Sequence, residues 1–257
     1  GADSISWSLP SGFTTGEFSF TLDDEYMAAP LEVTVTSGPG STTAVLTGPD
    51  CSAPVGGGGG TNVGTELAIC LPPLDFEADD AGGSLVRGQI IDNEWAAWGV
   101  HVTTNSPTNH PAMVFDSAIP TGGDTDLGTP GQDFGGPGRG AGGRNGKPGQ
   151  NSQALGKILI ISEDRDANDP DDNGGGGTVI FTFDIGVRMD DVYIVDIDHY
   201  EVAGTVRAYS DIAGGNLLVA NTMLGLGDNS VQAVPVNATG VRRLEVQFPG
   251  SGGIPAV

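Results

Sequence analysis

The sequence predicts an all-β protein: an antiparallel β-sandwich, jelly-roll-like, with a smaller β-rich segment at its N-terminal end. Short alternating or wholly apolar stretches recur along the chain, separated by turns rich in Gly, Asp, Asn and Pro. No apolar stretch with helical spacing is longer than two turns. The chain contains 43 Gly and 17 Pro, and much of this glycine is concentrated in a few runs, as in loops on a folded body. Periodicity alone does not give the strand order.

The first 73 residues form the smaller segment. Its expected strands lie at residues 17–22, 31–36, 42–46 and 65–71. Pro72 and Pro73 then form a natural hinge, so we place a boundary near residue 73. The sequence does not distinguish a small separate domain from strands that join the main sandwich.

The two cysteines of the chain, Cys51 and Cys70, bracket the glycine run at 56–60. A disulfide closing this loop of about 20 residues would contribute roughly 3 kcal/mol. We expect that bond, and with it an oxidising compartment; the alternative is two unpaired buried thiols. A zinc site is not expected, because no CxxC or neighbouring His accompanies them.

Residues 74–257 carry the clearer strand pattern. Expected strands lie at 85–91, 98–103, 112–115, 157–162, 178–185, 191–197, 204–209, 217–224, 231–236 and 242–248. Residues 157–162 are apolar on both faces, which predicts a central strand. In 178–185, Val179, Phe181 and Phe183 share one face.

A glycine-rich stretch at 121–153 interrupts this pattern. It carries Arg139, Arg144 and Lys147, three of the ten cations of the chain. Loops of this length are uncommon unless they are functional or disordered. It is either a mobile loop or an arm that docks on an acidic neighbour, within the molecule or in another copy.

The charge of the chain restricts its partners. Ten Lys and Arg against 33 Asp and Glu give a formal net charge of -23. Such a chain repels phosphates and anionic lipids, so nucleic acid and membrane surfaces are not expected partners. No run approaches the roughly 18 apolar residues of a membrane span. The start at Gly1, without Met or a signal-like segment, suggests a processed secreted protein or a trimmed chain.

The densest acidic stretch predicts a calcium site. Six carboxylates lie between Glu163 and Asp172, and residues 169–174 read D-x-D-x-N-G, the opening of a calcium loop. Oxygen ligands at alternate positions suit Ca²⁺. An EF-hand is rejected, because Ile180 stands where the bidentate Glu belongs and no helices flank the loop. The alternative is a solvated surface turn.

Two further acidic groups could supply ligands to the same ion. Asp124 and Asp126 lie two residues apart after the strand that ends near Asp116, and Asp196 and Asp198 share a strand face, with Glu201 nearby. Ligands for one calcium ion normally come from several loops. A solvated strand face is the alternative for the Asp196 pair.

No enzymatic activity is predicted. Asp196 and Asp198 could imitate a glycosidase pair, but the sequence does not give the separation that this chemistry requires. The chain has no G-x-S-x-G, H-E-x-x-H, P-loop or dinucleotide fingerprint. His101, His110 and His199 are interpreted as structural.

Aromatic residues offer an alternative role. Trp95, Trp98 and Tyr200 could stack on sugar rings, although core packing explains at least one of the tryptophans equally well. Asn237 begins an N-x-T sequon, a potential site for a surface glycan.

Nine short motifs occur in an order that resembles a domain found in large extracellular and cell-surface proteins of bacteria. They are DFE (75–77), WGV (98–100), AMVFDS (112–117), TGGDTDLGTP (121–130), LIISED (159–164), DPDDN (169–173), DID (196–198), GDNS (227–230) and FPGSG (248–252). The resemblance covers about residues 74–257. It implies a secreted jelly-roll-like sandwich, similar to calcium-stabilised carbohydrate-binding modules, without a catalytic role.

The resemblance also implies ion ligands at Asp116, Asp124, Asp126, Glu163, Asp164, Asp171 and Asp196. With the residues singled out above, the predicted metal ligands are Asp116, Asp124, Asp126, Glu163, Asp164, Asp169, Asp171, Asn173, Asp196 and Asp198.

The expected function is that of a non-enzymatic, calcium-stabilised secreted protein that self-assembles through β-strand addition into an extracellular filament, matrix or surface layer. The alternative is a calcium-dependent carbohydrate-binding or adhesion module for extracellular polysaccharide.

Overall fold

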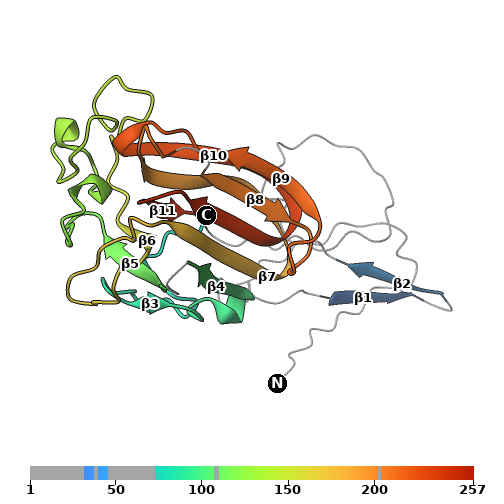
Figure 1. Ribbon diagram of the computed structural model, residues 1–257. Helices are drawn as coiled ribbons and strands as arrows, with labels where there is room; N and C mark the ends of the chain where they lie inside the picture. The colour runs from blue at the N-terminus through green and yellow to red at the C-terminus, as the bar shows by residue number, and fades with distance from the viewer. Residues whose placement is uncertain (1–31, 38–39, 46–72, 107–109, 202–203) are drawn as a thin grey trace.

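The computed structural model describes residues 73–106, 110–201 and 204–257, together with the backbone of two earlier strands. These two, β1 (Glu32–Ser37) and β2 (Gly40–Val45), pair antiparallel as a hairpin (Figure 1). They match the predicted strands at 31–36 and 42–46. The predicted strands at 17–22 and 65–71 and the Cys51–Cys70 disulfide lie outside the described residues, and the boundary near residue 73 stays a prediction.

The rest of the described chain is one antiparallel sheet of nine strands, which confirms the all-β, sandwich-like fold (Figure 1). The strands are β3 (Ile90–Ile91), β4 (Val100–Asn105), β5 (Ala112–Asp116), β6 (Lys157–Ile161), β7 (Gly177–Ile197), β8 (Thr205–Tyr209), β9 (Leu217–Thr222), β10 (Gly227–Phe248) and β11 (Gly253–Ala256). Three short 3₁₀ turns are η2 (Ala96–Trp98), η3 (Thr125–Leu127) and η4 (Gln132–Phe134). No helix among the described residues has the length and apolar character needed to cross a membrane.

The sheet folds over on itself because β7 and β10 are long and pass through both layers. The first half of β7 pairs with β4 and with the end of β10, and its second half pairs with β11 and the start of β10. One layer therefore has the order β4-β7-β10-β8-β9, and the other has the order β3-β5-β6-β11-β7-β10. Register shifts between Pro235 and Arg243 mark the bend. The sequence predicted two strands in place of β7 and two in place of β10. A bulged bend within a strand and a turn between strands interrupt the apolar alternation in a similar way.

The main core fills the space between the layers, and a second apolar cluster lies on the outer face of the β5–β6 layer. Leu159 and Ile161 of β6 belong to the main core, while Ile158 and Ile160 pack with Met113, Phe115 and Leu127 in the second cluster. The alternating residues of β6 are therefore buried on both sides, between β5 and β11. This confirms the prediction of a central strand at 157–162.

Two strand predictions need correction. Only Ile90–Ile91 of the predicted 85–91 strand is extended, because Leu85 instead donates its backbone N–H to Glu77 and Gly88 turns the chain at a positive φ of 81°. The short strand β11 was not predicted at all; it has four residues and contains Pro255.

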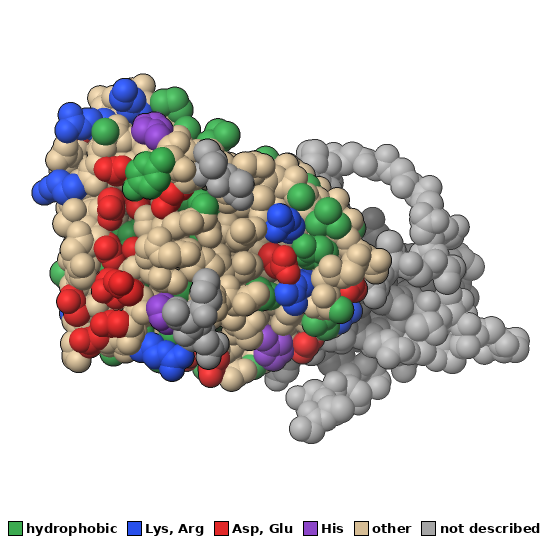
Figure 2. Space-filling model, viewed as in Figure 1, with side chains coloured by type: hydrophobic (Ala, Val, Ile, Leu, Met, Phe, Trp, Pro, Cys, Tyr) green, Lys and Arg blue, Asp and Glu red, His purple; other side chains and the backbone are tan. Residues whose placement is uncertain are grey.

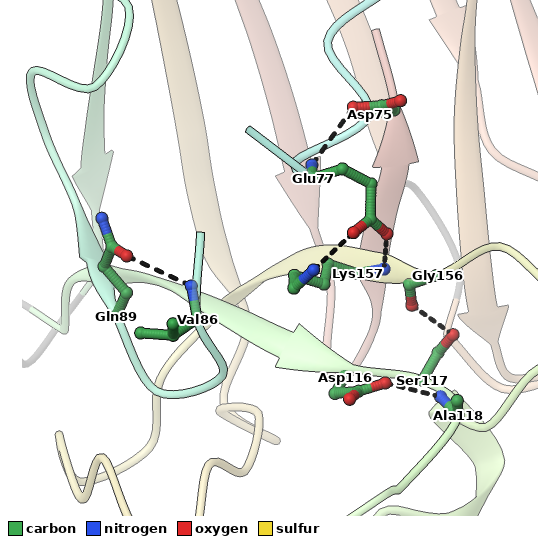
Figure 3. A network of polar contacts seen from close by, with 9 residues as sticks. All are labelled: Asp75, Glu77, Val86, Gln89, Asp116, Ser117, Ala118, Gly156 and Lys157. Atoms are coloured by element: carbon green, nitrogen blue, oxygen red, sulfur yellow. Dashed lines mark hydrogen bonds and ion pairs between the residues drawn. The ribbon is translucent and has the colours of Figure 1, made fainter. Parts of the chain in front are cut away.

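A polar network fixes the start of the described body to the β5–β6 edge (Figure 3). Glu77 accepts a hydrogen bond from the backbone N–H of Lys157 (2.8 Å) and forms an ion pair with its ammonium group. Ser117 Oγ donates to the carbonyl of Gly156 (2.6 Å), and Asp116 Oδ1 accepts from Ala118 (3.0 Å). This network lies at the end of the layer where β5 finishes and β6 begins.

Candidate metal centre

The opposite end of the same layer gathers carboxylates from four separate segments. There β6 and β7 end while β10 and β11 begin, because Gly253 faces both Ile160 and Val195, and Gly227 faces Ile197. The segment that leaves β5 places η3 and Leu127 over the outer face of the layer. It is tied to the loop after β6: Thr121 Oγ1 donates to the Pro170 carbonyl, and Gly122 N–H donates to Asp169 Oδ1, both at 2.8 Å.

Four of these residues, Asp124, Asp126, Asp172 and Asp196, form what we call the inner carboxylate group. Asp172 and Asp196 are buried, with 8% and 2% of their surface exposed. The backbone N–H of Asp172 donates to Asp124 Oδ2 (2.8 Å), which ties the loop after β5 to the loop after β6.

Backbone and hydroxyl donors hold the two buried carboxylates from the other side. Gly252 N–H donates to Asp172 Oδ2, while Asn229 N–H donates to Asp196 Oδ1 (2.7 Å) and Ser251 Oγ to Asp196 Oδ2 (3.1 Å). Both Asp196 and Asn229 adopt positive φ values, 64° and 62°, which are uncommon for residues other than glycine. The local backbone is therefore shaped to present these groups.

Burial and mutual repulsion favour the protonated forms of the inner group. Burial raises the pKa of Asp196 to about 8, with the charge of Asp126 adding to the effect. Burial raises the pKa of Asp124 to about 6, against a hydrogen bond from the Asp172 backbone, and the pKa of Asp172 is raised well above its usual value, by burial and by the charge of Asp124. The Asp126 pKa is also raised, chiefly by burial.

The described ion pairs do not include the inner group. The ion pairs in this part of the chain involve Glu77, Asp184, Asp190 and Glu245. Burial and the charge of Asp124 raise the pKa of Asp172, which favours a proton on the buried carboxyl. A bound cation could take the place of that proton.

The donor chemistry of the inner group suits Ca²⁺, since its ligands would be carboxylate oxygens with nearby backbone carbonyls. The spacing is not yet that of a binding site: no three His, Cys, Asp or Glu side chains in the described ranges are already arranged to hold a metal ion. Binding would require these carboxyl groups to rearrange around the ion.

The outer carboxylate group consists of Glu163, Asp164, Asp169 and Asp171, on the loop after β6. Glu163, Asp164 and Asp169 are exposed, and the loop is built from local turns in which Asp164 Oδ1 accepts from the Asp166 N–H (2.7 Å). The pKa of Asp171 is raised by burial and by the charges of the other three. Apart from Asp171, the group matches the solvated turn that was the alternative to a calcium loop.

The predicted ligand Asn173 makes hydrogen bonds within the same loop. Its Oδ1 accepts from the Gly175 N–H (3.1 Å), and its Nδ2 donates to the Gly176 carbonyl (2.9 Å). Gly174, at the expected sharp-turn position, has open space around its Cα and no positive φ. The resemblance of 169–174 to a calcium loop in sequence is therefore not matched by its backbone.

A third acidic group surrounds Asp198 at the end of β7. Burial and a side-chain contact with Asp228 raise the pKa of Asp198 to about 6. The hydrogen bond with Asp198 raises the pKa of the exposed Tyr200 to about 12. Glu201 closes this turn by accepting from the Asp198 and Ser251 backbone N–H groups, both at 3.0 Å.

Several predicted site residues do not meet the inner group. Asp116 lies in the network at the other end of β5, opposite Lys157 (Figure 3). Trp95 is in the core, 1% exposed, and its Nε1 donates to the Ala78 carbonyl (2.9 Å), so its prediction as a sugar platform is wrong. Trp98 is half-buried against the core. Asn237 is exposed on β10, as a glycosylation site requires.

Sequence reasoning missed three contributors: Asp172, Asn229 and Ser251. Asp172 belongs to the acidic run, and the other two belong to the GDNS and FPGSG motifs, but none was assigned a role. The feature of the sequence that could have identified Asn229 is the glycine-rich segment, which packs around this residue. Asn229 Nδ2 donates to the carbonyls of Asp126 (2.5 Å) and Gly128 (2.7 Å).

The glycine-rich segment packs against residues 227–230 at the start of β10, with almost no room for side chains. A Cβ at Gly138, Gly140 or Gly143 would lie 2.2 Å from a carbonyl oxygen. The backbone N–H groups of Gly142 and Gly143 donate to the Asp228 carbonyl. Of the two predictions for this segment, docking within the molecule is the one observed, although it uses backbone groups rather than the cations.

The cations of this segment lie at the surface, where Arg139 donates to the carbonyls of Gly136 and Gly138. Arg139, Arg144 and Lys147 are exposed. In Figure 2 Lys and Arg side chains gather at the upper left of the molecule, above a band of Asp and Glu.

Comparison with protein-family models, with curated proteins and with solved structures finds no match for this chain. The resemblance to bacterial extracellular domains therefore stays a prediction from the sequence.

Proposed function

We propose that this chain is a non-enzymatic secreted structural protein, stabilised by Ca²⁺, that self-assembles as a subunit of an extracellular filament, matrix or surface layer. The observation that carries the proposal is the inner carboxylate group. Its members come from three segments, two of them are buried, and none takes part in the described ion pairs.

Because the inner group buries like charges, binding of Ca²⁺ would be coupled to folding. Placing unpaired carboxylates in the interior costs several kcal/mol each in effective terms. A cation bound only by the folded chain would stabilise it by about 2.7 kcal/mol at 100 times its Kd. The ion would fasten the loops after β5 and β6 to the end of β7, and, through the donors Ser251 and Gly252, to the turn before β11.

The low solvent exposure of the inner carboxylate group agrees with a structural role. The oxygens of Asp172 and Asp196 accept hydrogen bonds from Gly252, Asn229 and Ser251, and both side chains are nearly inaccessible to solvent. A general acid or base has to reach a substrate proton within hydrogen-bonding distance. The raised pKa values of these groups therefore fit cation binding better than acid–base catalysis.

Secretion supports the choice of ion. Calcium sites of extracellular modules bind with Kd values of about 10⁻⁴–10⁻³ M, which a partly formed oxygen site can reach. Secretion itself rests on the resemblance and on the expected disulfide.

Calcium binding is tested by calorimetric titration of the full chain with CaCl₂ and, separately, MgCl₂, after EGTA treatment. We expect saturable Ca²⁺ binding and a higher unfolding temperature in Ca²⁺ than in EGTA. Assembly is tested by electron microscopy of the same samples, with filaments or sheets expected in millimolar Ca²⁺ and their loss in EGTA. Identical unfolding temperatures in both conditions would refute the calcium role, and monomers throughout would refute assembly.

One observation favours the alternative, a calcium-dependent carbohydrate-binding module. Tyr200 is 79% exposed and hydrogen-bonds to Asp198 beside Asp228, so an aromatic face and carboxylates are available together. A glycan array probed with the parent chain and with Tyr200→Ala tests it. Tyr193→Ala, at another exposed tyrosine, is the control. Binding lost only in the Tyr200 variant would support this function.

A further inference from the structure

The edges of the two layers differ in how well they are covered. An uncovered edge strand presents unpaired N–H and C=O groups to which another strand can add, and natural proteins protect such edges with charges, proline, bulges or covering loops. The folded-over sheet has four edges: β4 and β9 in one layer, and β3 and the first half of β10 in the other.

Three of these edges are protected. On β4, the N–H groups of Val100 and Val102 donate outward to the carbonyls of Trp95 and Asp92, so residues 92–95 cover this edge. The edge strand β3 has only two residues.

The first half of β10 is covered by neighbouring segments. Val231 N–H donates to the Gly149 carbonyl (2.9 Å), and Asn221 Nδ2 donates to the Pro235 carbonyl (2.6 Å). The Gln232 side chain makes two hydrogen bonds with the Leu224 backbone.

The fourth edge, β9, is tied to β10 only near its end, through Asn221 and the following Leu224, and its first residues have no such protection among the described residues. Its only strand partner there is β8. Its sequence, LLVANT, contains no charge and no proline, in a chain in which 17% of residues are charged. Leu217 is 54% exposed and Leu218 is 43% exposed, and Ile212 and Leu224, at either end, are also exposed. Grouped exposed apolar side chains on an open edge mark an interaction surface.

We propose that β9 pairs antiparallel with the β9 strand of a second copy of this chain, which joins the two sheets across a twofold axis. Charge favours this partner: two copies of net charge -23 repel each other, and an uncharged strand is where they can approach most closely. The other three edges of the folded-over sheet are protected, so pairing between two such sheets uses the same strand on both.

The second copy also fits the exposed leucines. A second β9 brings its own Leu217 and Leu218 to the contact. The β1–β2 hairpin, with Thr or Ser at six of its twelve positions, would cover them less well. The pairing deepens the assembly part of the proposed function by supplying one closed contact between subunits. It does not involve the inner carboxylate group, so the two proposals can fail separately.

The first test is the mass of the full chain in solution, measured by light scattering over a range of concentrations in EGTA and in Ca²⁺. We expect a concentration-dependent dimer in both conditions. Leu217→Lys/Leu218→Lys should weaken it on the order of 100-fold, because lysines would face each other in the contact. The control is Val86→Lys/Ile119→Lys, which makes the same charge change at two exposed apolar residues outside β9. It should leave the dimer intact.

The second test identifies the partner strand. A photo-reactive p-benzoylphenylalanine in place of Leu218, in a mixture of ¹⁴N- and ¹⁵N-labelled chains, should give mixed-label cross-links to residues 212–224. A parent chain that is monomeric at all concentrations would overturn the proposal. So would cross-links to residues 32–45, or equal loss of the dimer in both double variants. A dimer without Ca²⁺ binding would keep this inference and refute the calcium role.

Discussion

The inner and outer carboxylate groups contain the same number of acids, but their surroundings differ. The outer group lies within one loop, and three of its four members are exposed to water. The inner group is assembled from the loops after β5 and β6 and the end of β7, and its Asp172 and Asp196 are buried. Water screens the first group, while the second must be protonated or bind a cation. A high local density of acids in the sequence therefore does not by itself identify the site where charge matters most.

The largest expected effect is the pH dependence of stability without calcium. For a carboxyl whose pKa is raised on folding, the folded state holds more protons than the unfolded state, so stability falls as pH rises between the two pKa values. For Asp196 this interval runs from 3.8 to about 8, and the effect is at most on the order of 5 kcal/mol. Urea unfolding in EGTA should give a lower midpoint at pH 8 than at pH 5.

Calcium should reverse this trend, because the ion needs the deprotonated carboxylates and binds better at pH 8. The variant Asp196→Asn cannot ionise at this position, so its midpoint in EGTA should depend less on pH than that of the parent chain. A parent midpoint in EGTA that rises from pH 5 to pH 8 would contradict the account of the inner group.

Next in size is the loss of the calcium response. Asp172→Asn should remove most of the roughly 2.7 kcal/mol that Ca²⁺ supplies at 100 times its Kd, since the variant gives up a buried ligand. The outer-group variant Asp164→Asn should keep nearly all of it. Calorimetric unfolding temperatures with and without Ca²⁺ separate the two, and a calcium response lost in the Asp164 variant but kept in the Asp172 variant would place the ion on the outer loop.

A smaller effect distinguishes the glycines of the two regions. Gly143→Ala would place a Cβ 2.2 Å from the Asn229 carbonyl oxygen, so the turn behind Asp196 has to shift, at a cost of about 1–3 kcal/mol. Gly174→Ala, on the loop that carries the outer group, meets open space and should stay within about 0.5 kcal/mol of the parent chain. Urea unfolding measures both. Equal sensitivity would show that the glycine-rich segment is not tightly packed in solution.

The sequence predicted what depends on local pattern. It gave the central strand at 157–162, because Ile158 to Ile161 leave no polar face, and it named Asp124, Asp126 and Asp196 as ligands. It also listed Asp116 and Asn173 as ligands, because the sequence does not show at which end of the sheet each residue lies. Asp172 was not chosen, since Gly252, which donates to its carboxylate, lies 80 residues further along the chain. Contacts at such separations leave no periodic signal.

The smallest effect tests the other end of the layer, where a carboxylate does have a cation. Burial alone would raise the pKa of Glu77, but the hydrogen bonds and charge of Lys157 hold it below its usual value. This carboxylate therefore stabilises the fold above its unfolded pKa of about 4.5 and loses that contribution as pH falls, the opposite sign to the inner group. Glu77→Gln should cost about 1 kcal/mol or less, because the pair is partly exposed. The cost should shrink below pH 4 and be the same with and without Ca²⁺ in urea unfolding. A calcium-dependent cost would mean that the two ends of the layer are coupled, and that the ion acts on more of the sandwich than the loops around the inner group.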